Sequence, residues 1–366
     1  MLLQSLRLTN FRNYAAEQIR CAPQFNVVAG DNGMGKTNLL DAVHYLCLGK
    51  SYFSAQDRYV VRQQESFFRL EGRFLLDDQP ELIVAKVQPG KQKVLSRNEA
   101  PYQRISEHTG LLPVVFMVPD DTALAMDGAE ERRRFLDNTL CQLDRPYLEA
   151  LLAYNGVLEK RNALLRQSGS HNPPDTTLLD VYDQLLLEPA RTLFRLRQQF
   201  ISDFQPVFQR FYRDICRDTE AVGLSYASDL LTSDLALLLR THRQRDVLLQ
   251  RTSHGIHRDD LPFSLDGKPL KRFASQGQLK SFVLALKLAQ ATYLHERTGK
   301  PPILLLDDLF DKLDDHRVLQ LIGLLSDGSF GQVFLSDTHP DRAAAIADRY
   351  GLSYEHFLVR HGSIVR

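Results

Sequence analysis

Residues 30–37 read Gly-Asp-Asn-Gly-Met-Gly-Lys-Thr, which fits the phosphate-loop pattern G-x-x-x-x-G-K-[ST]. Glycines adopt the positive φ angles that let successive backbone N–H groups curl around phosphate oxygens. Lys36 can reach the β- and γ-phosphates of a nucleotide, and the hydroxyl of Thr37 can bind Mg²⁺. The sequence therefore predicts a nucleotide-binding loop that consists of Gly30, Asp31, Asn32, Gly33, Met34, Gly35, Lys36, Thr37 and Asn38.

Two carboxylates, Asp307 and Asp308, follow the apolar run 303–306. Such a run predicts a strand buried on both faces, and ligands of an open α/β sheet bind at the carboxyl ends of its strands. We expect Asp307 to hold Mg²⁺, directly or through water, and Asp308 to orient or deprotonate an attacking water. The alternative is a solvated acidic strand end.

A third polar group consists of Ser275, Gly277 and Gln278, which precede an apolar helical pattern. A serine and a glycine N–H at the start of a helix can form an anion site. The alternative is an ordinary capped helix. A second anion site in a chain that already has a phosphate loop requires an explanation.

The phosphate loop needs a strand before it and a helix after it, and the sequence predicts both. The apolar run within 24–29 indicates a buried strand, and a helical pattern begins at Thr37. Strands are also predicted at 302–306 and 332–335, with a helix at 315–325 between them.

Between these two ends lie a β-rich stretch and a helical one. Residues 66–98 predict antiparallel strands, and 111–118 is another buried run. From 127 to 250 the period is helical, broken by a loop at 167–175, and Pro189 and Pro206 are expected to kink or interrupt the second helix. The block is either a packed helical subdomain or a hairpin that exposes part of its apolar stripe to a partner. The pattern predicts one α/β domain built from both chain ends, with a helical insertion.

The chain has 366 residues, 45 basic and 45 acidic side chains, and therefore no formal net charge. A polybasic nucleic-acid binder is excluded, so any binding of an anionic polymer requires basic residues segregated on one face. The candidates are the basic stretches 267–280 and 86–104 and the arginines at 132–134. We interpret these arginines as a solvated face with ion pairs to Glu130 and Glu131, and contact with phosphates is the alternative.

Four widely spaced cysteines argue against a zinc site or a disulfide framework and favour a reducing compartment. The sequence contains no apolar run long enough to span a bilayer, and residues 1–14 do not resemble a signal peptide. We expect a soluble cytoplasmic protein without a membrane partner.

Several segments carry a family resemblance: residues 6–14, residues 114–121 followed by 131–137, and residues 254–261 running into Ser275. Together with the motifs above they resemble the ABC-type ATPase heads of the SMC group, and within it the bacterial DNA replication and repair proteins. The resemblance implies an α/β fold with a mixed sheet core, an antiparallel β subdomain and an inserted helical lobe. It divides the chain into residues 1–125 and 251–366 for the ATPase lobe and 126–250 for the helical lobe.

The resemblance also explains the second anion site. In this group two heads dimerise head to tail, and ATP lies between the phosphate loop of one chain and Ser275 and Gly277 of the other. It implies that Arg12 and Asn13 approach the nucleotide, that Asp314 reaches across the interface, and that Thr338 or His339 senses the γ-phosphate. Asp308 replaces the usual glutamate, which suggests slow hydrolysis. No glutamine follows 111–118, so the residue in that role stays open.

By resemblance, the chain is expected to be a weak, DNA-stimulated ATPase that works in recombinational repair and at replication gaps. Its cofactors would be ATP and Mg²⁺, and it would be a homodimer when ATP is bound. Its partners would be duplex or gapped DNA and mediator proteins of the RecO and RecR type, in a nucleoid-associated location. Two alternatives remain: the ATPase subunit of a membrane transporter, and a phosphate-loop kinase of small molecules.

Overall fold

The computed structural model describes residues 1–167, 174–216, 220–309, 315–326, 330–339, 342, 348, 351 and 353–365. The chain forms two compact units. Unit 1 comprises Met1–Thr122, Asp214–Arg217 and Lys280–Arg366, and unit 2 comprises Ala123–Arg213 and Asp218–Leu279. Unit 1 is thus assembled from both chain ends, whereas residues 251–279, which the sequence analysis grouped with the ATPase lobe, lie in unit 2.

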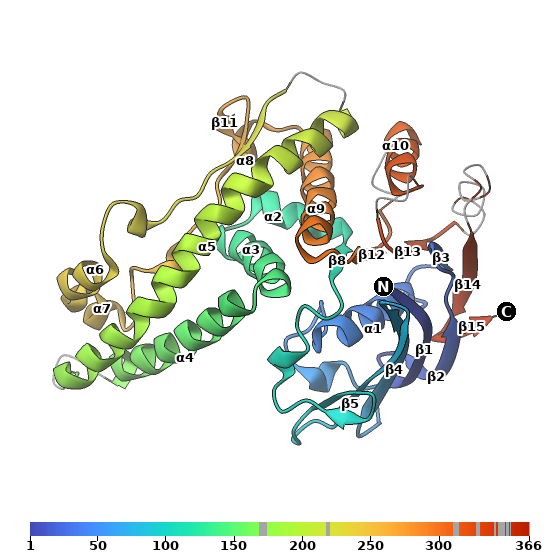
Figure 1. Cartoon of the computed structure of the whole chain (residues 1–366), viewed down its shortest axis with the longest axis horizontal. Helices are drawn as coiled ribbons and strands as arrows, with labels where there is room; N and C mark the ends of the chain where they lie inside the picture. Colours follow the sequence, from blue (N-terminus) through green and yellow to red (C-terminus); the bar gives the residue numbers. More distant parts are fainter. Residues whose placement is uncertain are drawn as a thin grey trace. The chain divides into compact units, whose positions relative to one another are not determined.

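Unit 1 contains an antiparallel sheet of six strands in the order β2-β1-β4-β5-β6-β7 (Figure 1). In β4 every second side chain is buried, as expected for a sheet with one covered and one open face. The antiparallel strands predicted within 66–98 are confirmed. The strands are β1 (Leu2–Phe11), β2 (Tyr14–Arg20), β4 (Phe68–Leu76), β5 (Gln79–Val87), β6 (Val94–Arg97) and β7 (Ala100–Pro101).

The second sheet of unit 1 is mixed, in the order β15-β14-β3-β13-β12-β8, and its central strands are parallel. All residues of β3, β8, β12 and β13 are buried, which explains their continuous apolar runs. The strands are β3 (Phe25–Ala29), β8 (Val114–Met117), β12 (Ile303–Leu306), β13 (Val333–Asp337), β14 (Tyr354–Arg360) and β15 (Ser363–Val365).

Helix α1 (Lys36–Leu48) follows β3 and contributes to the core that both sheets share. Figure 1 shows it beside β4. The approach is close, because a Cβ atom at Gly72 of β4 would lie 2.8 Å from Cδ1 of Leu46. The predicted strand–loop–helix order at residues 24–48 is therefore confirmed. The other described helices of unit 1 are α10 (Asp315–Ser326), most of α9 (Gln276–Thr298), and the short η1 (Asp57–Tyr59), η2 (Ile105–Glu107) and η3 (Pro119–Asp121).

Unit 2 is built around long helices and a small sheet of β9, β10 and β11. Its elements are α3 (Ala129–Leu143), α4 (Arg145–Gln167), α5 (Thr176–Cys216), α6 (Leu235–Thr241), α7 (Arg243–Leu249), α8 (Leu270–Phe273), β9 (Val222–Leu224), β10 (Phe263–Leu265), β11 (Lys268–Pro269), η4 (Asp229–Leu231) and η5 (Ile256–Arg258), and α2 (Thr122–Met126) begins at its border.

Most of the predicted loop at 167–175 lies outside the described residues. Two expectations in this region need correction. First, Pro189 and Pro206 do not interrupt α5, which continues through both; that they kink it stays a prediction. Buried side chains flank both prolines, so packing compensates for the lost backbone hydrogen bonds. Second, the helical block does not extend unbroken to 250, because residues 222–224 form strand β9.

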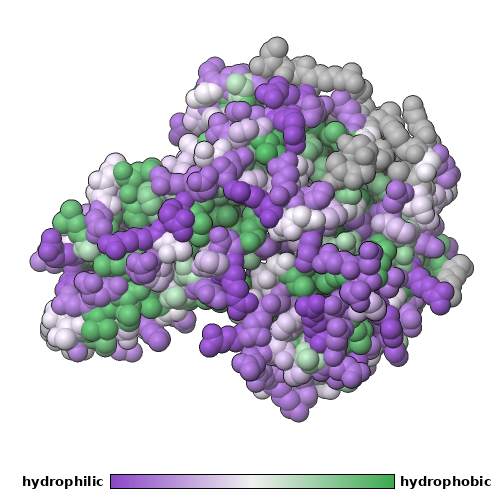
Figure 2. Space-filling model, in the orientation of Figure 1, coloured by the Kyte–Doolittle hydropathy of each residue, from purple (hydrophilic) through white to green (hydrophobic). Residues whose placement is uncertain are grey.

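Both interpretations of the helical block find support on α5. Leu179 and Leu186 are fully buried, as in a packed subdomain. Leu178, Val181 and Leu185 lie on another side of the helix and are 37 %, 48 % and 52 % exposed. Figure 2 shows apolar surface at several places on the face that it presents.

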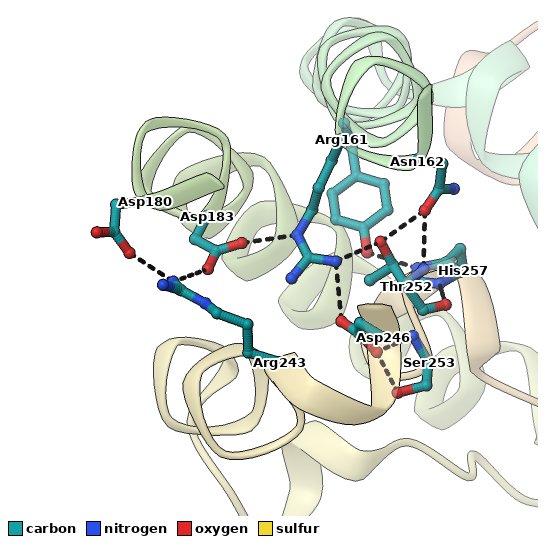
Figure 3. Close-up of polar contacts among 10 residues, drawn as sticks. Arg161, Asn162, Asp180, Asp183, Arg243, Asp246, Thr252, Ser253 and His257 are labelled. Atoms are coloured by element: carbon teal, nitrogen blue, oxygen red, sulfur yellow. Dashed lines mark hydrogen bonds and ion pairs between the residues drawn. The ribbon is translucent and has the colours of Figure 1, made fainter. Parts of the chain in front are cut away.

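A buried polar network fixes α4 against α5 and α7 (Figure 3). The guanidinium of Arg161, which is fully buried, donates to Asp183 at 2.7 Å and to Asp246 at 2.8 Å. Arg243 adds a bond to Asp183, also at 2.8 Å. Breaking a buried pair leaves a charge without compensation, so these contacts hold the helices in one arrangement.

None of the described helices combines the length and the apolarity needed to cross a membrane.

Three buried histidines make stability depend on pH. Burial lowers the pKa of His44, His108 and His257 to about 4. Between pH 6.5 and pH 4 the unfolded chain binds protons that these folded side chains do not, so the free energy of unfolding falls as pH decreases. We expect a loss of about 3 kcal/mol per histidine by pH 4.

His108 provides the test, because its Nε2 donates to the carbonyl of Leu46 at 2.7 Å, a bond that a glutamine can replace. Urea unfolding of His108→Gln should show a loss between pH 7 and pH 4 that is about 2–3 kcal/mol smaller than in the wild type. His356→Gln, which removes an exposed histidine, is the control. An unchanged pH dependence in His108→Gln would contradict the prediction.

Candidate nucleotide-binding site

The phosphate loop adopts the positive φ angles that its glycines were predicted to supply. Gly30, Gly33 and Gly35 have φ angles of 150°, 80° and 122°. A Cβ atom at Gly30 would lie 2.4 Å from the carbonyl oxygen of Val359, and one at Gly35 would lie 2.5 Å from the side chain of Asn13. The backbone conformation therefore favours glycine at all three positions, and the close approach of the Val359 backbone also requires it at Gly30.

Lys36 and Thr37 open α1, directly after the loop. The ammonium of Lys36 donates to the carbonyl of Gly30 at 2.9 Å and lies 3.6 Å from a carboxylate oxygen of Asp308. The hydroxyl of Thr37 lies 2.8 Å and 3.0 Å from the two carboxylate oxygens of Asp307. The structure thus brings the loop and the two carboxylates together, although Thr37 and Asp307 are 270 residues apart in the sequence.

The carboxylates reach this place because β12 pairs in parallel with β8 and β13. The backbone N–H of Asp307 continues that pairing and donates to Met117 at 2.9 Å. Ser336, at the end of β13, bonds both acids: its hydroxyl donates to Asp307 at 2.7 Å and accepts from the N–H of Asp308 at 2.8 Å. The sequence analysis missed Ser336: it follows the predicted strand at 332–335, but the sequence does not show that this strand pairs with 303–306.

The local electrostatics suit a cation. Burial raises the pKa of Asp307 above its ordinary value, and hydrogen bonds from Ser336 and Thr37 oppose that shift. A hydroxyl and a carboxylate within 3.0 Å of each other are the hard oxygen donors that Mg²⁺ prefers, so the donor set fits this ion. Asp308 has a φ of 43°, a conformation that non-glycine residues rarely adopt and that occurs often at functional sites.

Asn13 and Asn38 lie against the loop. The side chain of Asn13 donates to the carbonyl of Met34 and accepts from Asn38, both at 2.8 Å. Arg12 lies differently: its guanidinium bonds Asp41 of α1 at 3.0 Å and Ser51 at 2.9 Å. The described contacts of Arg12 thus involve α1 and its surroundings rather than the loop.

The predicted switch region begins beside the loop, because the N–H of Gly30 donates to the carbonyl of Asp337 at 3.3 Å. The N–H of His339 donates to the Asp337 side chain at 2.9 Å, and the His339 side chain is 70 % exposed. Its role toward a γ-phosphate stays a prediction. Asp314 lies outside the described residues.

Ser275 begins α9 in a reciprocal cap. Its hydroxyl accepts from the N–H of Gln278 at 3.2 Å, while the Gln278 side chain accepts from the N–H of Ser275 at 2.7 Å. This is the geometry of a capping box, so the structure shows the capped helix that the sequence analysis gave as the alternative. Ser275 is exposed and Gly277 partly exposed; both belong to unit 2, whereas the phosphate loop belongs to unit 1. Their part in nucleotide binding stays a prediction.

The residue that replaces the missing glutamine after β8 stays open. Asp121 is occupied, because it accepts from the N–H of Val118 at 2.8 Å and the hydroxyl of Tyr52 at 3.0 Å and pairs with Lys287 at 3.1 Å. Asp120 is exposed.

The segments 131–137 and 254–261 meet in the interior of unit 2. Arg197 of α5 is 1 % exposed, and it bonds Asp137 from the first segment and Asp259 from the second, each at 2.8 Å. Arg132 also joins the segments through Asp260 at 2.7 Å. These residues link distant parts of unit 2, a role that their positions in the sequence did not reveal.

The arginines at 132–134 divide between the two interpretations considered. Only Arg134 pairs with the neighbouring Glu130 and Glu131, at 2.6 Å and 2.7 Å. Arg132 bonds Asp260, and Arg133 donates to the backbone carbonyl of Asp259 at 2.6 Å. The cluster is therefore largely engaged within the protein.

His254 and His257 are three residues apart in the sequence, a spacing that could offer two ligands to a metal ion. The structure contains no group of three or more potential metal ligands among His, Cys, Asp and Glu in its described part.

Comparison with known proteins is informative over nearly the whole chain. The model of the RecF/RecN/SMC N-terminal domain family matches residues 2–356. A DNA replication and repair protein RecF of Flavobacterium johnsoniae is 40 % identical over 98 % of this chain and 99 % of the relative. The RecF of Porphyromonas gingivalis (strain ATCC 33277) is 41 % identical over the full length of both chains.

Solved structures also match the fold of this chain. A structure of the recombination mediator protein RecF with ATP, in the RecFOR pathway, matches with a TM-score of 0.89 and 26 % identity, covering 100 % of this chain and 97 % of the other. An Smc head domain of Pyrococcus furiosus matches with a TM-score of 0.56 and 14 % identity over 100 % and 96 %. The predicted fold, an ABC-type ATPase head with a mixed sheet, an antiparallel β subdomain and helical content, is confirmed.

Proposed function

Because this chain belongs to the RecF/RecN/SMC N-terminal domain family, among its RecF proteins, we propose that it is an ATP-dependent DNA-binding protein of replication and recombinational repair. The observation that carries the proposal is the convergence of the phosphate loop with Asp307 and Asp308. ATP bound to a relative of the same fold supports the choice of nucleotide.

We assign different residues of the site to phosphate binding, Mg²⁺ binding and the activation of water. Backbone N–H groups of the loop and the ammonium of Lys36 would bind the phosphates, while Thr37 and Asp307 would hold Mg²⁺. When bound, the ion supplies charge that stabilises the phosphates during transfer. Asp308, beside the loop, would orient or deprotonate water. Its carboxylate has a shorter reach than a glutamate, so we propose slow, DNA-stimulated hydrolysis that acts as a switch.

We further propose that ATP joins two copies head to tail, so that Ser275 and Gly277 of one copy face the phosphate loop of the other. A symmetric pair of composite sites accounts for a second potential anion site in one chain. Because the γ-phosphate would contact both copies, ATP favours the dimer and hydrolysis releases it. The dimer would bind duplex or gapped DNA and work with mediators of the RecO and RecR type.

The alternative function, the ATPase subunit of a membrane transporter, is not favoured. The matched relatives align along the entire chain, including the helical region between the phosphate loop and Ser275. Their names assign them to DNA replication and repair.

Dimerisation is tested by light scattering after gel filtration, with and without ATP, on wild type and Ser275→Arg. Wild type should change from monomer to dimer on addition of ATP. Ser275→Arg should bind ATP yet remain monomeric, because a bulky side chain would stand where the partner's phosphates are expected. Ser225→Arg, at another exposed serine of unit 2, is the control. A wild type that stays monomeric with ATP contradicts the switch, and a Ser275→Arg dimer contradicts the composite site.

A further inference from the structure

The open face of the antiparallel sheet carries several basic side chains. Cross-strand register places Arg20 of β2 beside Ser5 of β1, and Ser5 beside Arg73 of β4. The same register places Arg69 beside Lys86 of β5. Leu6, Leu8 and Leu70 point to the opposite face and are fully buried in the core, so these polar positions point outward.

Five basic residues lie on this face; we call them the basic face: Arg7, Arg20, Arg69, Arg73 and Lys86. Arg7, Arg20, Arg73 and Lys86 are exposed. Only one acidic residue, Glu71, lies among them on the open side of β1, β2, β4 and β5, and it bonds Arg69 at 2.6 Å. The other four have no ion-pair partner in the described chain, so the face has a net charge of about +4 in a protein whose total formal charge is zero.

Two of the three basic clusters singled out in the sequence, 132–134 and 86–104, contain paired residues. Arg132 and Arg134 are paired, as shown above. In the stretch 86–104, Lys93 pairs with Asp57 at 2.8 Å and Arg97 pairs with Glu81. Within the described residues, the basic face gathers unpaired positive charge from four strands, whereas the basic residues of 267–280 lie on one short stretch of chain.

The dimensions and composition of the face suit a duplex backbone. Strands lie about 4.8 Å apart, so β2 and β5 are separated by roughly 14 Å, and Arg69 and Arg73 by roughly 13 Å along β4. A span of this size is comparable to the roughly 12 Å width of the DNA major groove, so the side chains can contact phosphates of both strands. The open positions of β1, β2, β4 and β5 carry no aromatic side chain on which unpaired bases could stack.

We propose that the basic face binds the phosphate backbone of double-stranded DNA. The inference rests on the proposed function and deepens it by assigning the DNA a surface on unit 1. Contacts to phosphates are independent of base sequence and weaken as salt increases.

Glu71 provides a test in which the affinity for DNA should increase rather than decrease. The hydrogen bond from Arg69 lowers the pKa of Glu71, and the charges of Arg69, Arg7 and Arg73 add to this effect. The carboxylate is therefore ionised at neutral pH, offsets part of the positive charge and would repel phosphates. Glu71→Gln removes that charge and should tighten binding of duplex DNA severalfold, a gain that damage to folding would not produce.

The main experiment measures binding of a fluorescent 30-base-pair duplex by anisotropy at several salt concentrations, with and without ATP. The triple variant Arg7→Gln/Arg73→Gln/Lys86→Gln is compared with Lys160→Gln/Arg166→Gln/Arg195→Gln, which removes three exposed charges from unit 2. We expect the first variant to bind at least about tenfold more weakly, and the slope of log K against log[salt] to be shallower by about 3. The control should bind like wild type.

The outcomes separate this proposal from the proposed function. If wild type binds duplex DNA with ATP dependence and the basic-face variant does the same with equal affinity and slope, the surface is wrong and the function stands. If the variant loses affinity while ATP has no influence on wild type, the surface stands and the switch falls. A loss restricted to single-stranded DNA, or an unchanged affinity of Glu71→Gln, would overturn the assignment to duplex DNA.

Discussion

Lys36→Met should weaken ATP binding about 100-fold and slow hydrolysis by about 10²–10³-fold or more. Lys36 is 4 % exposed, and its ammonium donates to the carbonyls of Gly30 and Asp31, at 2.9 Å and 3.3 Å. It is thus pre-oriented toward the place where phosphate charge would lie. Methionine keeps the approximate volume but removes the charge and its hydrogen bonds, so few other properties of the loop should change.

The measurement is a titration with a fluorescent ATP analogue, followed by turnover of ATP in the presence of duplex DNA. Lys160→Met, at an exposed position of α4, is the matched control. Thermal unfolding without nucleotide confirms that both variants are folded. Wild-type affinity for ATP in Lys36→Met would mean that the nucleotide binds elsewhere, and the proposed function would then lose the observation that carries it.

Arg197→Met should reduce the free energy of unfolding by about 3–5 kcal/mol. Arg197 bonds the carboxylates of Asp137 and Asp259, the hydroxyl of Tyr147 and the backbone carbonyl of Ile256. Asp259 is 2 % exposed, and burial raises its pKa while the charge of Arg197 opposes that shift. Without the guanidinium, a buried carboxylate would lack its counter-charge.

Urea unfolding followed by far-ultraviolet circular dichroism gives the comparison. Arg195→Met is the control, because it removes an exposed arginine from the same helix, two residues away. A change below about 1 kcal/mol for Arg197→Met would show that the cluster contributes specificity rather than stability.

Sequence reasoning succeeded where the signal was local. The phosphate loop lies between an adjoining strand and helix, so short-range patterns identified it together with Lys36 and Thr37. Asp307 followed from a four-residue apolar run and the rule that ligands bind at strand ends. Ser336 and the basic face depend on which strands become neighbours, and a one-dimensional pattern does not contain that information.

The same limit applies to the charges. For the arginines at 132–134 we expected ion pairs with the neighbouring glutamates, and only Arg134 makes them, whereas Arg132 pairs with Asp260, far along the chain. Arg7 and Arg73 stand alone in the sequence, and the register of β1 and β4 brings them to one face. Proximity in the sequence therefore did not identify the partners of Arg132, and it concealed the grouping of Arg7 with Arg73.

The position of β3 between β13 and β14 has a consequence for biosynthesis. Both neighbours come from the last part of the chain, and Val359 of β14 packs against Gly30. The antiparallel sheet is encoded entirely within the first 101 residues, so its strands are available early. At roughly 5–20 residues per second, synthesis of the remaining chain takes tens of seconds. We therefore expect the phosphate loop to acquire its final shape only near the end of translation, after the strands that carry the basic face have been synthesised.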